Sequence, residues 1–208
     1  GAVFAGREIG RELFTEYVAN FGFGEKTGVG LPGELAGDTR RLSPKERDIA
    51  FATASYGQGI AATALEMINS FAAIANGGVL MRPYLNAEFE PEATRRVIKP
   101  DTARQVAEMM ISAVDKAEIA KVSGYAIAGK TGTAYVPDFK KGGYTENVIN
   151  TYVGFAPASD PQFIILVKLD NPAGAPLAGL SVVPAFRDLA QFMLNYYNIP
   201  PDRLEKSS

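Results

Sequence analysis

The sequence contains no cysteine and no histidine among its 208 residues. Without cysteine, disulfide bonds and thiolate metal sites are excluded. Without histidine, a Ser-His-Asp triad, a Cys-His dyad and a histidine-ligated zinc site are excluded as well. If the chain takes part in catalysis, lysine, tyrosine, aspartate or glutamate must therefore carry the protons.

Two further absences concern membranes and nucleic acids. No apolar run approaches the ~20 residues that a membrane-spanning helix needs, and no signal peptide opens the chain. The formal net charge is −2, which gives no basic surface for a phosphate backbone, so no nucleic-acid partner is expected. Because 47% of the residues are hydrophobic and 21% are charged, the composition indicates one globular domain with a real core, or most of one.

The first half of the chain is predicted to be helical, with one long loop. Apolar residues at helical spacing indicate a helix from the N-terminus to near Gly22. Residues 21–42 are rich in glycine and should form an irregular loop. Two capping-box patterns, at Ser43–Glu46 and Thr63–Glu66, should begin helices that end near Thr53 and at Gly77-Gly78.

The second half is predicted to be a helix, a sheet and a closing helix. Asp101 should cap a helix that buries Met109 and Met110, and the tight turn at 158–161 should make its flanking strands antiparallel. Helices followed by antiparallel strands and a packing helix indicate an α+β fold. The predicted segments are strands at 79–85, 125–136, 147–156 and 163–170, a helix at 183–195 with Phe186, Leu189, Ala190 and Met193 on its apolar face, one domain over 1–200, and a polar, loose tail at 201–208.

A lysine motif in the second half matches a phosphate-binding pattern. Residues 124–131, Gly-Tyr-Ala-Ile-Ala-Gly-Lys-Thr, satisfy G-x-x-x-x-G-K-[ST]. In a P-loop, a helix must begin at the lysine so that its N-terminus faces the phosphates. The letters Tyr-Ala-Ile-Ala prefer a strand, and the glycine, the β-branched residues and the proline that follow are a poor helix start. The P-loop is therefore the weaker interpretation.

The stronger interpretation places Lys130, Thr131, Gly132 and Thr133 on a strand. Lys130 and Gly132 then share one face and the two threonines share the other, and a twist at Gly132 would bring the ammonium and both hydroxyls to one cleft. A cation, two hydroxyls and free N–H groups suit an extended peptide that carries a carboxylate. An ordinary edge strand with an exposed lysine explains the tetrapeptide equally well.

The tetrapeptide and its surroundings resemble one family. Lys130-Thr131-Gly132-Thr133 has the form of the Lys-Thr-Gly element of penicillin-binding proteins and serine β-lactamases. Residues 21–34, 52–78 and 150–161 resemble, in family order, segments of the class B, monofunctional penicillin-binding proteins of septal, elongation and sporulation type. The resemblance runs from Gly1 to about Pro200. It implies their α+β fold, an antiparallel sheet flanked by helices, with the N-terminal part of the transpeptidase domain missing.

Two family motifs are missing from the sequence. The family nucleophile is the serine of Ser-x-x-Lys, and no serine here has a lysine three residues on; Ser-x-Asn is absent too. We expect both motifs upstream in a longer parent protein, whose N-terminal part would contribute two strands and the helix that bears the serine. The chain alone is then expected to be inactive.

The resemblance implies an acyl transfer. A serine attacks the D-Ala-D-Ala carbonyl of a peptidoglycan stem peptide, and a β-lactam acylates the same serine. Lys130 would place positive charge near the substrate carboxylate and help relay a proton, while Thr131 and Thr133 would bind that carboxylate. The backbone N–H of Thr133 would be an oxyanion donor, and Gly132 would let the substrate lie against the strand.

A second group of substrate-binding candidates is weaker. Tyr56, Gly57, Gln58 and Gly59 would line the cleft by resemblance, but a tight turn between helices also needs glycine at such positions. No cofactor and no metal are expected.

Partners and location are likewise implied by resemblance. The parent's partners would be a lipid-linked glycan polymerase and division or elongation proteins, and it would lie outside the cytoplasm, anchored in the membrane by an N-terminal segment. The alternatives are a β-lactam sensor or hydrolase, a non-catalytic interaction module of the divisome or elongasome, and, more distantly, a P-loop NTPase.

Overall fold

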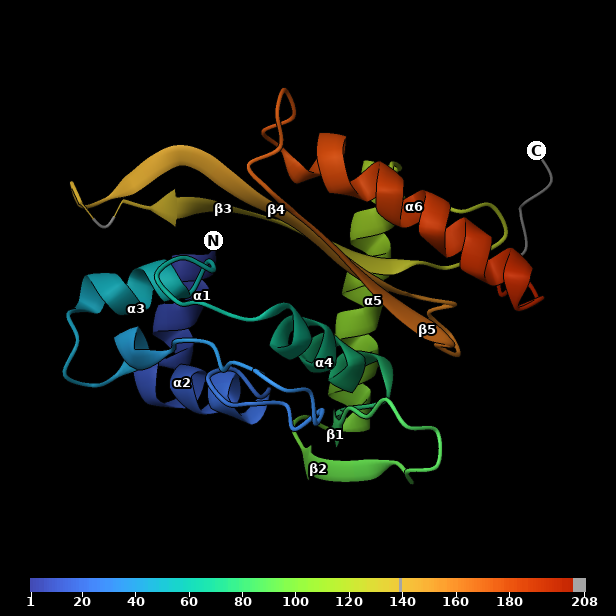
Figure 1. The fold of residues 1–208 in the computed structure, drawn as a ribbon, viewed down its shortest axis with the longest axis horizontal. Helices are drawn as coiled ribbons and strands as arrows, with labels where there is room; N and C mark the ends of the chain where they lie inside the picture. The colour runs from blue at the N-terminus through green and yellow to red at the C-terminus, as the bar shows by residue number, and fades with distance from the viewer. Residues whose placement is uncertain (139, 204–208) are drawn as a thin grey trace. The chain divides into compact units, whose positions relative to one another are not determined.

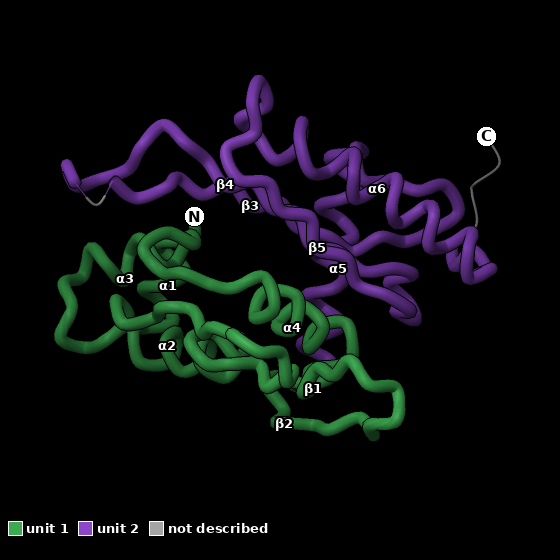
Figure 2. Tube along the Cα trace, in the orientation of Figure 1, with its two compact units in different colours: residues 1–100 green, residues 101–208 purple. Residues whose placement is uncertain are grey.

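The computed structural model describes residues 1–138 and 140–203. These residues divide into two compact units, Gly1–Pro100 and Asp101–Ser208, which Figure 2 distinguishes by colour. The division falls at the start of the long helix α5 (Pro100–Ala117). The expectation of one domain over residues 1–200 stays a prediction.

The first unit is mainly helical (Figure 1). The prediction of a single N-terminal helix is wrong, because Gly10 adopts a left-handed φ of 84° and separates two helices. Most of residues 21–42 form the predicted irregular loop. The elements are α1 (Ala2–Ile9), α2 (Arg11–Asn20), the 3₁₀ helix η1 (Arg40–Leu42), α3 (Asp48–Ala54), α4 (Ala64–Ala75), β1 (Val79–Arg82) and β2 (Glu92–Arg96).

Only one of the two predicted capping boxes forms. The Thr63 hydroxyl accepts a hydrogen bond from the Glu66 N–H, and the Glu66 carboxylate accepts one from the Thr63 N–H, so α4 begins where predicted. The prediction of a capping box at Ser43 is wrong, because α3 begins only at Asp48. The Arg11 guanidinium donates to the Ser43 and Glu46 carbonyls, at 3.2 and 2.7 Å, and holds this segment as a turn.

The strands β1 and β2 form a small antiparallel pair. The strand predicted at 79–85 is β1, which ends at Arg82. β2 was not predicted, because its residues Glu-Ala-Thr-Arg-Arg lack the alternation of apolar and polar side chains. Both strands therefore form, but one of them has no signature in the sequence.

The second unit holds an antiparallel sheet with the strand order β3-β4-β5. Its three predicted strands and the antiparallel turn between the last two are confirmed. β4 is longer than β5, and its pairing with β5 ends at Ile149 opposite Asp170. Before Ile149, the strand that pairs with β4 among the described residues is β3, although the Val148 carbonyl still accepts a hydrogen bond from the Asn171 N–H. The elements are α5, β3 (Ala128–Pro137), β4 (Tyr144–Ala156), β5 (Phe163–Asp170) and α6 (Ala178–Tyr196).

The core of this unit lies between α6 and the sheet. Phe186 and Ala190 are fully buried, as predicted, and the Phe186 ring lies 4.5 Å from the Tyr152 ring of β4. Two predicted core residues are exposed instead: Leu189 keeps 47% of its surface accessible and Met109 keeps 67%. On α5 the buried residues are Ala103, Met110 and Val114, and on α6 they are Ala178, Val182, Val183, Phe186, Ala190 and Leu194.

The start of the predicted tail is held in place. The Asp202 carboxylate accepts hydrogen bonds from the Ala126 N–H at 2.7 Å and the Ser159 hydroxyl at 2.6 Å, and Arg203 pairs with Asp115 at 2.7 Å. The prediction of a loose tail is therefore wrong for residues 201–203, while residues 204–208 lie outside the described residues. No helix of the described segments is long and apolar enough to cross a bilayer.

Candidate functional site

The predicted binding strand is the edge of the second unit's sheet. Lys130 to Thr133 lie within β3, which among the described residues pairs only with β4. The register places Lys130 opposite Val153 and Thr133 opposite Asn150. Because Lys130 lies inside a paired strand and no helix begins there, the P-loop interpretation is wrong.

The lysine side chain lies along this edge. Its Nζ donates a hydrogen bond to the carbonyl of Thr131 at 2.7 Å. This contact indicates that the Thr131 carbonyl points away from β4. In an antiparallel strand, the N–H and C=O of one residue point to the same side, and the side alternates along the chain. The N–H of Thr133, two residues further on, is therefore directed to the same open edge.

The two faces of β3 differ in what they contact. The Thr133 hydroxyl accepts a hydrogen bond from the N–H of Ala178, the first residue of α6, at 3.4 Å. On the opposite face, a Cβ at Gly132 would overlap the Thr151 hydroxyl of β4. Any side chain at this position would therefore require the Thr151 hydroxyl to move, whether or not a ligand is bound.

A buried amide lies directly behind Thr133. Asn150 is fully buried, and its Nδ2 donates to the Ser181 hydroxyl at 2.9 Å and to the Ala175 carbonyl at 3.2 Å. Its Oδ1 has no hydrogen-bond partner within the described parts of the chain. Asn150 therefore ties β4 to the start of α6. The sequence analysis did not single it out, although a polar residue within an apolar strand is a signal.

A second residue that the sequence analysis did not single out is Tyr152, which lies opposite Thr131 in the register. Its side chain is 3% exposed, and its hydroxyl lies over Gly129, where any Cβ would overlap it. Burial raises the pKa of the Tyr152 hydroxyl, so the group is neutral at physiological pH. The residue before Lys130 must therefore be glycine for this tyrosine to fit.

Tyr56, Gly57, Gln58 and Gly59 form a turn that follows α3 in the first unit. Gly57 and Gly59 have φ values of 87° and 80°, which side chains rarely adopt. The N–H groups of Gly57 and Gln58 donate back to carbonyls of the end of α3. The turn needs its glycines whether or not it binds substrate, and its binding role stays a prediction.

A buried carboxylate holds the glycine-rich loop of the first unit. Glu66, at the start of α4, is 1% exposed. Besides the Thr63 N–H of its capping box, it accepts hydrogen bonds from the N–H groups of Gly24 at 2.9 Å and Gly37 at 2.7 Å. A Cβ at Gly37 would overlap this carboxylate. The sequence predicted Glu66 as a cap but not as the anchor of a loop 29 to 42 residues away.

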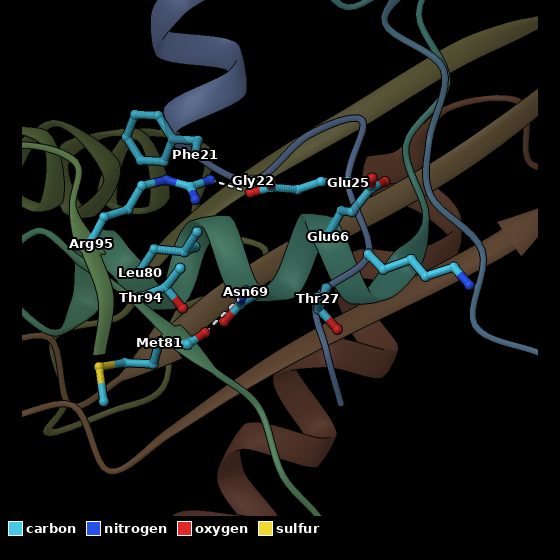
Figure 3. A pocket seen from close by; sticks show the side chains of 11 residues that line it. Phe21, Gly22, Glu25, Thr27, Glu66, Asn69, Leu80, Met81, Thr94 and Arg95 are labelled. Carbon is cyan, nitrogen blue, oxygen red and sulfur yellow. Dashed lines mark hydrogen bonds and ion pairs between the residues drawn. The ribbon is translucent and has the colours of Figure 1, made fainter. Parts of the chain in front are cut away.

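Glu66 also lines a pocket of about 110 Å³ (Figure 3). Arg95 pairs there with Glu25 and donates to the Asn20 carbonyl at the end of α2. Asn69 donates to the Met81 carbonyl at 3.0 Å. Each of these polar side chains has a protein partner, so the pocket is best explained as part of the support for the loop.

The fold and the Lys130–Thr133 motif together point to one protein family. The family model for the penicillin-binding protein transpeptidase domain matches residues 2–191. The chain belongs to the penicillin-binding protein transpeptidase family, as the resemblance predicted.

Individual relatives agree with this assignment. Stage V sporulation protein D of Bacillus subtilis is 36% identical over 192 residues, which are 84% of this chain and 29% of that protein. The transpeptidase domain of penicillin-binding protein 3 from Burkholderia pseudomallei superposes with a TM-score of 0.86 at 31% identity, covering 98% of this chain and 63% of that one. Penicillin-binding protein 3 of Mycobacterium tuberculosis, solved with ampicillin, gives a TM-score of 0.85 at 31% identity, covering 99% and 50%. The chain thus spans about a third of the length of the curated relatives that it matches.

Proposed function

We propose that this chain provides the substrate-binding strand of a serine-type peptidoglycan D,D-transpeptidase. The nucleophilic serine is carried by polypeptide other than these 208 residues, because no Ser-x-x-Lys occurs in them. One observation carries the proposal: Lys130-Thr131-Gly132-Thr133 lies on a sheet edge in a chain of the transpeptidase family. Relatives named peptidoglycan D,D-transpeptidases support the reaction class.

The edge offers the groups that an acyl transfer to and from serine needs. The serine attacks the carbonyl of D-Ala-D-Ala, terminal D-Ala leaves, and the acyl group passes to an amine of another strand. In this proposal, the N–H of Thr133 stabilises the oxyanion, and Lys130 supplies positive charge for the carboxylate that Thr131 and Thr133 bind. The relative solved with ampicillin supports a β-lactam as an alternative ligand.

The remaining parts of the proposal concern the longer protein. It acts outside the cytoplasm on peptidoglycan, is anchored in the membrane by an N-terminal segment, and works with a lipid-linked glycan polymerase and division or elongation proteins. The relative named Stage V sporulation protein D supports sporulation as an alternative process.

Fluorescent penicillin tests the proposal on the protein that joins this chain to its Ser-x-x-Lys segment. Lys130→Ala should slow covalent labelling by roughly 10²-fold, the scale of losing a group that stabilises charge in the transition state. Lys140→Ala, in the exposed hairpin loop, is the matched control and should label normally. The 208-residue chain alone should not label.

Normal labelling of the Lys130→Ala protein would remove Lys130 from the site. A longer protein without any Ser-x-x-Lys would instead favour the non-catalytic interaction module.

A further inference from the structure

Asn150 is a fully buried polar residue of β4 whose side chain reaches the start of α6. Its Nδ2 has two acceptors, the Ser181 hydroxyl at 2.9 Å and the Ala175 carbonyl at 3.2 Å. Because a carbonyl can only accept, the amide nitrogen and not its oxygen must face this segment. The Oδ1 has no protein partner within the described residues, and a buried acceptor in this state costs stability. The orphaned oxygen thus offsets part of what the two hydrogen bonds contribute, so stability does not fully account for the amide.

The two acceptors of Asn150 lie on either side of Ala178, the first residue of α6. Ser181 in turn donates its own hydrogen to the Leu177 carbonyl at 3.2 Å. The side chain of Asn150 therefore ties together both ends of the segment 175–181. In doing so it fixes the position of the Ala178 N–H.

The Ala178 N–H donates to the Thr133 hydroxyl at 3.4 Å. This N–H has no partner inside its helix, and Leu177, the N-cap residue, supplies no side-chain cap. A hydroxyl that accepts in this way keeps its own hydrogen for another partner, and Thr133 is exposed. The hydrogen bond is long, so a small movement of the segment 175–181 would break it.

Asn150 is connected to both partners of this hydrogen bond. It lies opposite Thr133 in the pairing of β3 with β4, and its side chain holds the segment around Ala178. The separation of the hydroxyl from the N–H is therefore set by one residue.

We propose that Asn150 is a positioning residue. Through the first turn of α6, it holds the Thr133 hydroxyl as an acceptor of the Ala178 N–H, so that the hydroxyl hydrogen is directed to the carboxylate of the substrate. This inference rests on the proposed function, in which Thr133 binds that carboxylate.

Asn150→Leu tests the proposal in the protein that joins this chain to its Ser-x-x-Lys segment. Acylation by benzylpenicillin, measured by the mass of the intact protein, should slow roughly tenfold, the scale of one hydrogen bond to a charged group. Asn147→Leu, the same substitution at an exposed position of β4, is the matched control and should be acylated normally. Normal acylation of Asn150→Leu would overturn the positioning role and leave the proposed function standing. A wild-type protein that is not acylated at all would overturn both.

The ligand carboxylate separates positioning from support of the fold. The methyl ester of benzylpenicillin lacks the negative charge, so Asn150→Leu should leave its slower acylation unchanged. An equal loss with both ligands would mean that Asn150 acts on the fold and not through the Thr133 hydroxyl, which contradicts the proposal.

A double substitution tests the route through Thr133. Thr133→Val removes the hydroxyl, and in that background Asn150→Leu should have no further effect on acylation by benzylpenicillin. Two residues that act through one hydrogen bond are not additive. Losses that add in the double variant would contradict the proposal.

If Asn150→Leu does not fold, Ser181→Ala decides. It removes one of the two acceptors of Asn150 at a half-buried position. Acylation by benzylpenicillin should slow roughly two- to fivefold, the scale of one net hydrogen bond, and should not slow further in the Thr133→Val background. Unchanged acylation of the folded Ser181→Ala protein would then overturn the positioning role.

Discussion

The two units of the chain are stabilised in different ways. In the second unit, one cluster of twelve buried residues joins α6 to the sheet. In the first unit, the two clusters of buried apolar residues have three members each, and a single carboxylate, Glu66, binds three backbone N–H groups of the surrounding loops. A large apolar core tolerates few polar contacts, whereas a glycine-rich loop without such a core depends on them.

The largest effect is expected from the apolar core. Phe186→Ala should lower the free energy of unfolding of the second unit by about 3–5 kcal/mol, because Phe186 is fully buried against Tyr152 and Gly154. Hydrogen exchange of the β4 amides measures it. Leu189→Ala, on the exposed side of α6, is the control, and an equal loss there would contradict the described packing.

The polar anchor should have the next largest effect. Glu66→Gln keeps the shape of the side chain but leaves a single acceptor oxygen for three N–H groups, so it should cost about 1–3 kcal/mol. The amides of Gly24, Gly37 and Thr63 should exchange faster, and those of β4 should not. Exchange that rises equally in both units would mean that the loop does not depend on Glu66.

The capping boxes allow a paired comparison within the first unit. Thr63→Ala removes a cap that forms and should cost about 1 kcal/mol. Ser43→Ala changes a residue whose predicted capping box does not form. It should change the unfolding free energy by less than about 0.5 kcal/mol. Denaturant unfolding of both variants measures the difference, and similar losses would restore the predicted cap at Ser43.

The smallest effect concerns the ion pair between Asp115 and Arg203. Hydrogen bonds from Arg203 hold the pKa of Asp115 below its ordinary value of 3.8. A lowered folded-state pKa contributes stability above the ordinary value, and this is lost as the pH falls through the folded-state pKa. The pair is partly exposed, so Arg203→Gln should cost at most about 0.5 kcal/mol at pH 7.

The same substitution should cost nothing at a pH low enough to protonate Asp115. Melting temperatures of the two proteins at both pH values measure the difference. A deficit that does not depend on pH would mean that Arg203 acts through packing rather than charge.

Most of the second unit was predictable because the sequence patterns that mark its strands depend on neighbouring residues alone. The alternation of residues marks the strands, and the edge position of Lys130 follows from a motif on the first of three strands. The positions of Tyr152 and Asn150 were not predictable, because each depends on contacts with another strand or with α6.

The first unit was harder for the same physical reason. Thr63 caps its own helix and was predicted correctly. The box at Ser43 failed because its two N–H groups have other acceptors: the Ser43 N–H donates to the Arg40 carbonyl and the Glu46 N–H to the Ser43 carbonyl. Arg11, 32 residues earlier in the chain, holds this turn by donating to the Ser43 carbonyl as well. The charged strand β2 carries no apolar pattern, and only its pairing with β1 makes it a strand.

The unequal lengths of β4 and β5 have a mechanical consequence for the binding strand. Thr133 lies opposite Asn150, one position before the last pair that β4 makes with β5. Lys130 to Thr133 are therefore backed by the full width of the sheet, while the hairpin beyond them is a two-stranded ribbon, which twists more freely. The two-stranded ribbon begins just past Thr133. The far end of the hairpin can therefore bend or accept insertions while Lys130 to Thr133 keep their positions in the sheet.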